Sequence, residues 1–423
     1  MSSAISENAD EDDLFSKASE AADELYKIRE RFYPANPDEK ASILESKSDL
    51  ALQLLDAIPH ERRKLPIQRA TYEYLRGKIL DVFPDYRKEA EEHLSKAVKL
   101  NPSLVDAWLC LGNCIWKKRD FSSVKNCFVF GLSKGPNKRI LCQLSMLERE
   151  MAQGAEDVAE IVEESVKHAK EAITLDVKDG YSWYNLGNAY YTSFFVTGAW
   201  DHRKLLQSLK AYQNSERDER MKCYPDLYFN FATLNKYLEN YEKALTGFEA
   251  AALKDPGLNA TEEVQQVLYL LDKLHSLLTG RSKSKRLSSM ALSLNNVNGN
   301  PSYRKTTIDF LSRGLNKGVV LIGKVLFSVK PGTLTPPYYV LCDSTQACYV
   351  LPAYGVQNEA IKEGDTITLF QPHCHHVDFS WKGKHYQFKS VRADFSEQVL
   401  VNGKALSSRH GVGSSFYLQY KPF

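Results

Sequence analysis

The chain has 423 residues, of which 43% are hydrophobic and 26% charged, and its formal net charge is +2. This length accommodates two or three domains, and the composition is that of a globular protein. With a net charge so close to zero, the chain as a whole has no strong electrostatic field that would attract nucleic acid or a membrane surface. Any charged partner must therefore be recognised by local clusters of charged residues.

The first residues are acidic, with Glu7 followed by the run Asp10–Asp13. They lack the basic and apolar regions of a secretory signal. The longest apolar run, 319–329, is interrupted by Lys324 and is too short to span a bilayer. We therefore expect a cytoplasmic protein, with the nucleus as a second location, and no membrane contact.

Eight cysteines are scattered along the chain, as expected for reduced thiols that pack as small hydrophobic residues. Cys110 and Cys114 share a helical face, but no second pair follows at the spacing of a zinc site. The run His373–His376 is dense in metal ligands, yet consecutive residues on a strand point in opposite directions. We expect neither a metal nor a cofactor.

Residues 1–67 show helical periodicity from Asp13 to about Ile58 and predict leading helices, with a degenerate first repeat as the alternative. Repeats follow over 68–280. The unit that starts at Val105 has the spacing of a tetratricopeptide repeat, a helical hairpin with large, small and proline residues at fixed offsets. Its marker residues are Trp108, Leu111, Gly112, Ile115, Val124, Phe128, Gly131 and Pro136.

Pro225 opens a second regular unit, and Trp183 begins a third whose second helix is delayed to Ser208. Two divergent units cover 74–102 and 139–175, and an amphipathic helix over 262–278 is expected to cap the array. Stacked hairpins form a solenoid with an extended concave surface, which suits peptide binding better than chemistry.

In each first helix, positions two, five, nine and twelve are expected to line this concave groove. Amide side chains there offer donors and an acceptor to a peptide main chain, and tyrosines offer stacking area with a polar tip. The alternative is that these residues only solvate or stiffen the groove. The candidates from the regular units are Asp106, Asn113, Tyr181, Tyr184, Asn188 and Tyr191.

The charges expected in the groove are mixed. Asp106 and Asp226 suit a cationic ligand group, whereas Arg149 suits a carboxylate and can bind it with two parallel hydrogen bonds. An ion pair of Arg149 with Glu148 or Glu150 is the alternative, although neighbours in sequence do not face each other on a helix. The pattern favours a short peptide with adjacent basic and acidic residues.

Residues 281–315 are rich in basic, serine and asparagine residues and predict a linker. Its basic run is either solvated or in contact with a phosphate backbone. This run contains Arg281, Lys283, Lys285 and Arg286.

Residues 316–423 alternate with a period of two and predict a small β-barrel of the OB type, with a sandwich as the alternative. The expected strands cover 319–329, 338–342, 348–351, 366–370, 385–391 and 398–401. Trp381, Tyr386 and Phe388 lie among lysines, an arrangement that suits base stacking, although alternation places half of such aromatics in a core.

The fold class is therefore α+β and multidomain, an α-solenoid followed by an OB-like barrel. The sequence has no glycine-rich phosphate loop with a lysine, no nucleophile elbow and no paired metal histidines on a helix. We expect a protein that is not an enzyme.

The order of regular and insertion-bearing repeats ending in an OB-like domain resembles the family of tetratricopeptide repeat protein five, also called Strap. The segments that carry the resemblance are Lys96–Leu100, Ser182–Asn188 and Pro225–Leu227. The resemblance implies an adaptor that reads the N-terminal Met-Arg-Glu peptide of nascent tubulin near the ribosomal exit tunnel and recruits an mRNA-decay adaptor. The alternative it implies is a nuclear scaffold that links transcription factors to histone acetyltransferase coactivators in stress response.

By the same resemblance, the family's groove arginine falls on Arg149 and its groove aspartate on Asp226. Its ribosome-contacting basic residues fall on Lys283, Lys285 and Arg286. A further groove acid has no direct counterpart, because Asn259 and Ala260 occupy its place; Glu262 or Glu263 is expected to substitute.

Overall fold

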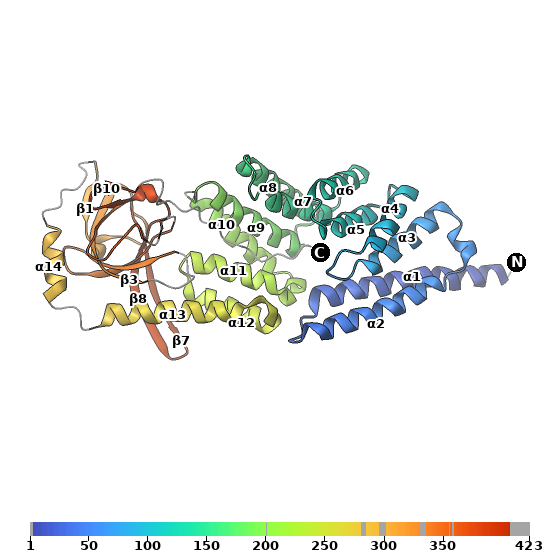
Figure 1. The fold of residues 1–423 in the computed structure, drawn as a ribbon, viewed down its shortest axis with the longest axis horizontal. Coiled ribbons are helices and arrows are strands. Elements are labelled where there is room, and N and C mark those ends of the chain that lie inside the picture. Colours follow the sequence, from blue (N-terminus) through green and yellow to red (C-terminus); the bar gives the residue numbers. More distant parts are fainter. Residues whose placement is uncertain are drawn as a thin grey trace.

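The computed structural model describes residues 3–199, 201–280, 285–295, 302–329, 336–354, 356–357 and 359–406. A curved array of helices leads into a β domain at one end of an elongated molecule (Figure 1). This arrangement confirms the expected fold class, a helical repeat solenoid followed by a β-rich domain.

The helices form successive antiparallel hairpins, α1 with α2, α3 with α4, and so on to α11 with α12. Their bounds are α1 Ser3–Arg31, α2 Pro37–Asp56, α3 Pro66–Leu80, α4 Lys88–Leu100, α5 Val105–Trp116, α6 Phe121–Lys134, α7 Lys138–Met151, α8 Val158–Leu175, α9 Gly180–Val196, α10 His202–Glu216, α11 Pro225–Tyr237, α12 Tyr241–Lys254, α13 Ala260–Thr279 and α14 Lys285–Ser293. The helices predicted from the repeat spacing are all present.

Small residues at fixed positions let the two helices of a hairpin approach closely. A Cβ added to Gly187 on α9 would lie 2.6 Å from the ring of Tyr212 on α10, and Gly112 on α5 faces Phe128 on α6 in the same way. Such contacts leave no room for a side chain, because protein interiors are close-packed. The spacing of glycine and aromatic residues in the sequence therefore reflects the packing of the two helices in each hairpin.

The β domain is one sheet in the order β10-β9-β6-β3-β4-β5-β8-β7-β2, and β1 also pairs with β3. Its strands are β1 Arg304–Thr306, β2 Gly314–Leu315, β3 Val319–Val329, β4 Tyr338–Cys342, β5 Cys348–Pro352, β6 Thr366–Phe370, β7 His373–Trp381, β8 Lys384–Arg392, β9 Val399–Val401 and β10 Lys404–Ala405. The long strand β3 is central, flanked by β4 and β6.

Two parts of the β domain differ from expectation. The segment predicted as a linker over 281–315 contains β1, which pairs in parallel with β3, and β2, which pairs with β7. It also contains α14, whose Leu287 and Ala291 are buried. The strand β7 was not among the expected strands, because the run His373–His376 was considered only as a candidate metal site.

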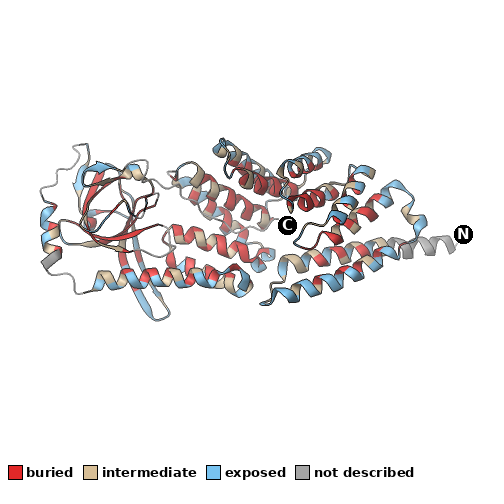
Figure 2. Ribbon diagram, in the orientation of Figure 1, coloured by how far each residue is buried: buried red, intermediate tan, exposed pale blue. Residues whose placement is uncertain are grey.

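The array and the β domain share one hydrophobic core. Apolar residues of α12 and α13 pack with residues of β3, β4, β5, β7 and β8 (Figure 2). Tyr386 and Phe388 are buried in this core and Trp381 packs against it, so these aromatics do not form the base-stacking surface that their lysine neighbours suggested. The expected capping helix α13 is therefore covered by the sheet.

A buried arginine lies at the centre of this joint. Arg392 on β8 binds Asp394 with its Nε at 2.9 Å and donates from Nη1 to the backbone oxygen of Tyr237, at the end of α11, at 2.7 Å. Its guanidinium carbon lies 4.4 and 4.5 Å from the ring centroids of Tyr237 and Tyr354. The Asp394 carboxylate also lies 2.8 Å from His202 Nε2 on α10.

The joint depends on the ionised form of Asp394. Burial alone would raise the pKa of this carboxyl, but Arg392 and His202 outweigh burial and hold the pKa at about 2. The opposite holds for Glu239 in the same joint, where burial raises the pKa although Arg392 lies 4.0 Å away. Arg392 therefore stabilises Asp394 more than Glu239.

We expect substitution of Arg392→Met to lower the free energy of unfolding by about 3–5 kcal/mol, because two buried carboxylates lose their cation. Lys382→Ala, which breaks an exposed pair with Glu249, should cost at most about 1 kcal/mol. Urea unfolding followed by circular dichroism measures both values. Equal losses would show that the buried charge does not hold the joint.

The depressed pKa of Asp394 also predicts a pH dependence. An unfolded aspartate titrates near pH ~4, so the stability that this group contributes is present above that pH and is lost as pH falls from about 4 to about 2. The loss should amount to about 2–3 kcal/mol. Asp394→Asn should remove this part of the acid-side slope, and an unchanged slope would contradict the assignment.

Candidate functional site

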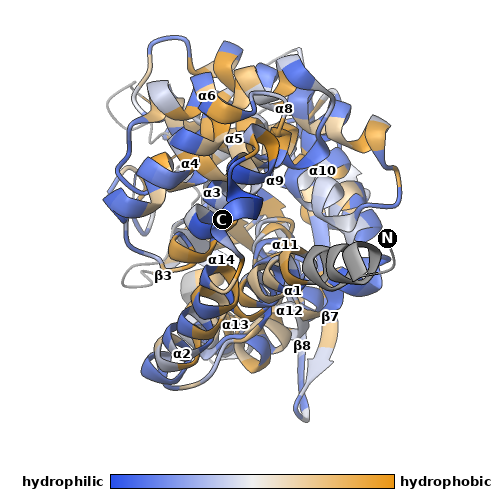
Figure 3. Ribbon diagram, turned by 90° about the vertical axis from the view of Figure 1, so that its right-hand side faces the viewer, coloured by the Kyte–Doolittle hydropathy of each residue, from blue (hydrophilic) through white to orange (hydrophobic). Residues whose placement is uncertain are grey.

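The first helices of the hairpins, α5, α7, α9 and α11, line the inside of the array. Seen from the end, α5, α9 and α11 lie towards the middle of the curve, with α6, α8 and α10 outside them (Figure 3). Consistent with this, α9 contacts both α7 and α11. The groove residues predicted from sequence lie on these four helices.

Arg149, near the end of α7, is only 3% exposed. Its Nη1 donates to the backbone and hydroxyl oxygens of Ser145 at 3.0 and 2.8 Å and to the hydroxyl of Ser165 at 3.0 Å. Its Nη2 donates to Oδ1 of Asn185 on α9 at 2.8 Å. The guanidinium is thus held in one orientation between α7, α8 and α9.

Asp226, in the first turn of α11, is also 3% exposed. It lies close to tyrosines on two other elements: its negative charge adds to burial in raising the pKa values of Tyr184 and of Tyr33, which follows α1. Arg149 and Asp226 therefore occupy enclosed places on either side of α9. The sequence suggested that both side chains line one open groove. The structure corrects this expectation, because each of them is enclosed.

Asn188, predicted to clamp a peptide, forms hydrogen bonds with other residues of the array. Its Oδ1 accepts hydrogen bonds from the hydroxyl of Tyr212 at 2.6 Å and from Nδ2 of Asn230 at 3.2 Å. Asn230 also donates to the Tyr184 hydroxyl at 2.9 Å. This buried network ties α9 to α10 and α11, so the reading in which the amide stiffens the groove applies to Asn188.

The remaining candidates are spread out. Tyr191 is buried against Phe195, and Asp106 is exposed at the start of α5, near Tyr74 of the preceding hairpin. Asn113 is buried, and its Oδ1 has no hydrogen-bond partner among the described residues. Asp106 is therefore not brought together with Asp226.

Helix geometry explains why some of the positions predicted to line the groove face neighbouring helices. If positions four, eight and eleven centre the hairpin contact, a turn of about 100° per residue places positions two, six and nine opposite and positions five and twelve on the flank. Tyr184 and Arg149 hold these flank positions and meet neighbouring hairpins. Position six, which the sequence analysis missed, carries Gln143, Asn185 and Asn230, an amide in three successive first helices.

The basic run lies mostly outside the described part of the chain. Arg281 and Lys283 are among the residues that the structure does not describe, and for Lys285 and Arg286 only the backbone is described, in α14. Of the two acids considered at the capping helix, Glu263 pairs with Lys236 on α11 at 2.7 Å, whereas Glu262 is exposed. Glu263 is therefore the acid that faces an inner helix.

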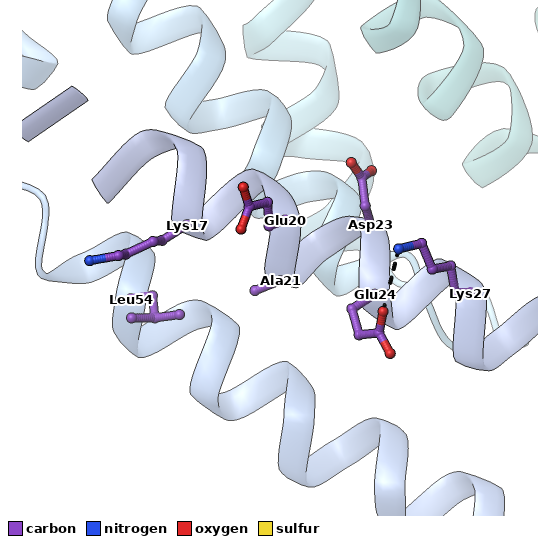
Figure 4. A pocket seen from close by; sticks show the side chains of 7 residues that line it. All are labelled: Lys17, Glu20, Ala21, Asp23, Glu24, Lys27 and Leu54. Carbon is purple, nitrogen blue, oxygen red and sulfur yellow. Dashed lines mark ion pairs between the residues drawn. The ribbon is translucent and has the colours of Figure 1, made fainter. Parts of the chain in front are cut away.

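A surface hollow of about 590 Å³ lies between α1 and α2, away from the inner helices. Its lining is mostly charged, and Glu24 pairs with Lys27 at 3.6 Å (Figure 4). It is not the apolar pocket with convergent acid and base groups that catalysis requires.

Neither a metal cluster nor a membrane helix was found in the described residues. No group of three or more His, Cys, Asp or Glu side chains in the described ranges is placed to hold a metal ion. The helices of the same ranges do not combine the length and apolarity needed to cross a membrane.

Hairpins of this spacing joined to a β-barrel-like domain define a tetratricopeptide-repeat adaptor for protein interactions. Residues 302–415 match the family model described as the tetratricopeptide repeat protein 5 OB fold domain. The chain is 36% identical over 419 residues to the Homo sapiens protein named tetratricopeptide repeat protein 5, covering 93% of this chain and 94% of the relative. The Mus musculus protein of that name is 40% identical over 354 residues, covering 79% and 80%. The chain belongs to the tetratricopeptide repeat protein 5 family.

Two similar solved structures each match part of the chain. One is YrrB, described as a TPR protein with an unusual peptide-binding site, at 18% identity and a TM-score of 0.34, covering 49% of this chain and 94% of that one. Another is the APC/C hetero-tetramer Cut9-Hcn1, at 16% identity and a TM-score of 0.43, covering 60% and 49%.

The two asparagines at position nine should respond differently to substitution. Asn188→Leu should lower the free energy of unfolding by about 2–3 kcal/mol, because Tyr212 and Asn230 lose their acceptor. Asn113→Leu, which removes an acceptor without a partner among the described residues, should cost less than about 1 kcal/mol. Urea unfolding compares them, and a larger loss for Asn113→Leu would refute the network.

Proposed function

We propose that this chain is a non-enzymatic adaptor whose inner face binds the N-terminal peptide of nascent tubulin on the ribosome and recruits an mRNA-decay adaptor. The observation that supports the proposal is the pair of enclosed opposite charges, Arg149 and Asp226, on either side of α9. A peptide that begins Met-Arg-Glu carries adjacent charges of the complementary signs.

Enclosed charges discriminate between ligands more strongly than exposed ones. A charge that is already desolvated and oriented gains more from a partner, and removing that partner leaves the other charge buried and unpaired. The guanidinium of Arg149 is oriented by Ser145, Ser165 and Asn185 before any ligand arrives. This preorganisation lowers the entropic cost of binding.

We expect Arg149→Met and Asp226→Asn each to weaken binding of a Met-Arg-Glu peptide by about 30-fold or more, equivalent to about 2 kcal/mol. Fluorescence anisotropy with a labelled peptide measures the change. Asp106→Asn is the matched control, because this aspartate also lies in the first turn of an inner helix but is exposed. If the wild-type chain does not bind the peptide, the proposal fails.

A separate experiment tests the ribosome contact. Reversal of Lys283, Lys285 and Arg286 to Glu should abolish co-sedimentation with translating ribosomes, because phosphate contacts depend on the cations, while peptide affinity stays unchanged. Loss of both activities together would indicate misfolding, which circular dichroism detects. Unchanged co-sedimentation of the folded variant would contradict this role for the basic run.

A further inference from the structure

Two cysteines face each other across the hairpin formed by strands β4 and β5. Cys342 and Cys348 are directly opposite in the antiparallel register of these strands. Cys342 is buried, Cys348 is partly exposed, and both are thiols in the structure. We call Cys342 and Cys348 the hairpin thiols.

The position of this pair in the ladder brings the two main chains close together. Hydrogen-bonded and non-hydrogen-bonded pairs alternate along antiparallel strands. The next pair is hydrogen-bonded, because the Asp343 amide donates to the Ala347 oxygen at 3.1 Å. The other end of the hairpin agrees, because Ala353 donates to the Pro337 oxygen at 3.0 Å, an odd number of pairs away in the same register. The hairpin thiols therefore occupy a non-hydrogen-bonded pair.

This pair has the geometry that a disulfide needs. The Cα atoms of a non-hydrogen-bonded pair are about 4.5 Å apart, and those of linked cysteines lie between about 4.4 and about 6.8 Å apart. The side chains of opposite residues also share one face of the sheet. Here it is the face towards the array, since Cys342 belongs to the core that the sheet shares with α12 and α13, and Cys348 packs against that core.

The two thiols differ in their access to solvent. Burial raises the pKa of Cys342 to about 12, with the nearby Cys348 and Asp343 as further causes, so this thiol stays protonated. Cys348 is partly exposed, and its Sγ donates to the backbone oxygen of Gln346, in the turn, at 3.8 Å. A dissolved oxidant therefore reaches Cys348 before Cys342.

Packing alone explains a small apolar side chain at position 342, because a buried thiol behaves as a small hydrophobic residue. It does not call for a second thiol, partly exposed and directly opposite. Cys110 and Cys114 on α5 show the contrast, because both are buried and neither offers a thiol at which oxidation could begin.

We propose that the hairpin thiols are an oxidation site that forms a reversible intrachain disulfide when the chain meets a peroxide. The Cys348 sulfur attacks one oxygen of hydrogen peroxide and the O–O bond breaks. Cys348 becomes a sulfenic acid, and the leaving hydroxide takes up the thiol proton as water. This inference does not depend on the proposed function.

The second step closes the bridge. The Cys342 sulfur attacks the Cys348 sulfur, the S–O bond breaks, and the leaving hydroxide takes up the Cys342 proton as water. Two thiols and one peroxide thus give one disulfide and two molecules of water. A thiol such as glutathione reverses the reaction by attack on the bridge, through a mixed disulfide.

The test treats the reduced, full-length chain with hydrogen peroxide and follows its cysteines by alkylation and peptide mass spectrometry. The hairpin thiols lie on one tryptic peptide, because no lysine or arginine separates them. We expect this peptide to become two hydrogen atoms lighter and to resist iodoacetamide. Dithiothreitol should restore both alkylation sites, and Cys110 and Cys114 should stay reduced throughout.

Three variants assign the two steps. Cys342→Ser should leave Cys348 as a sulfenic acid, so labelling of Cys348 with dimedone should rise about tenfold over the wild type. Cys348→Ser should leave Cys342 reduced, because burial shields it. Cys223→Ser is the matched control, since it removes an exposed thiol outside the hairpin and should not change formation of the disulfide. Circular dichroism verifies that each variant is folded.

Either of two outcomes would overturn the oxidation site. One is equal dimedone labelling of Cys348 in the wild type and in folded Cys342→Ser, which would show that Cys342 does not attack the sulfenic acid. The other is a hairpin peptide that remains fully alkylated at a peroxide concentration that oxidises Cys223.

Discussion

The arrangement of the whole molecule depends on the buried guanidinium of Arg392. Transferring a charge from water into a protein interior costs several kcal/mol, and only good geometry with a partner offsets that cost. Arg392 meets this condition with Asp394, two residues after it in the chain, the backbone oxygen of Tyr237 and two tyrosine rings. A joint of this kind tolerates one relative position of the array and the β domain.

The same joint constrains the inner face of the array through a single helix. Helix α11 carries Asp226 in its first turn and ends at Tyr237, which accepts the hydrogen bond from Arg392. The β domain therefore holds the C-terminal end of the helix whose first turn carries Asp226. The shared core of α12, α13 and the sheet adds area to this contact and covers the last helical face, which would otherwise be exposed.

Elements with strong periodicity could be predicted from the sequence, and contacts between distant segments could not. The hairpins followed from Gly112, Phe128 and their counterparts, because packing within a hairpin is local and repeats at fixed offsets. The β7 strand, with its histidines, carried no such signal. For the site, the helices were predicted correctly, but the facing of Arg149 and Tyr184 was not, because flank residues are oriented by a neighbouring hairpin. The joint between the array and the β domain could not be predicted, because the sequence does not show which aromatic residues pack against α12 and α13.

The two enclosed charges beside α9 differ in the way their surroundings are built. Arg149 is surrounded by hydroxyl and amide oxygens, which fix the orientation of its fork and suit a ligand group with matching planar geometry, such as a carboxylate. Asp226 lies beside Tyr184 and Tyr224, and its negative charge adds to burial in raising the pKa of both hydroxyls. Under the proposed function, a ligand would meet these two charges with two groups at a fixed spacing, because α9 lies between them.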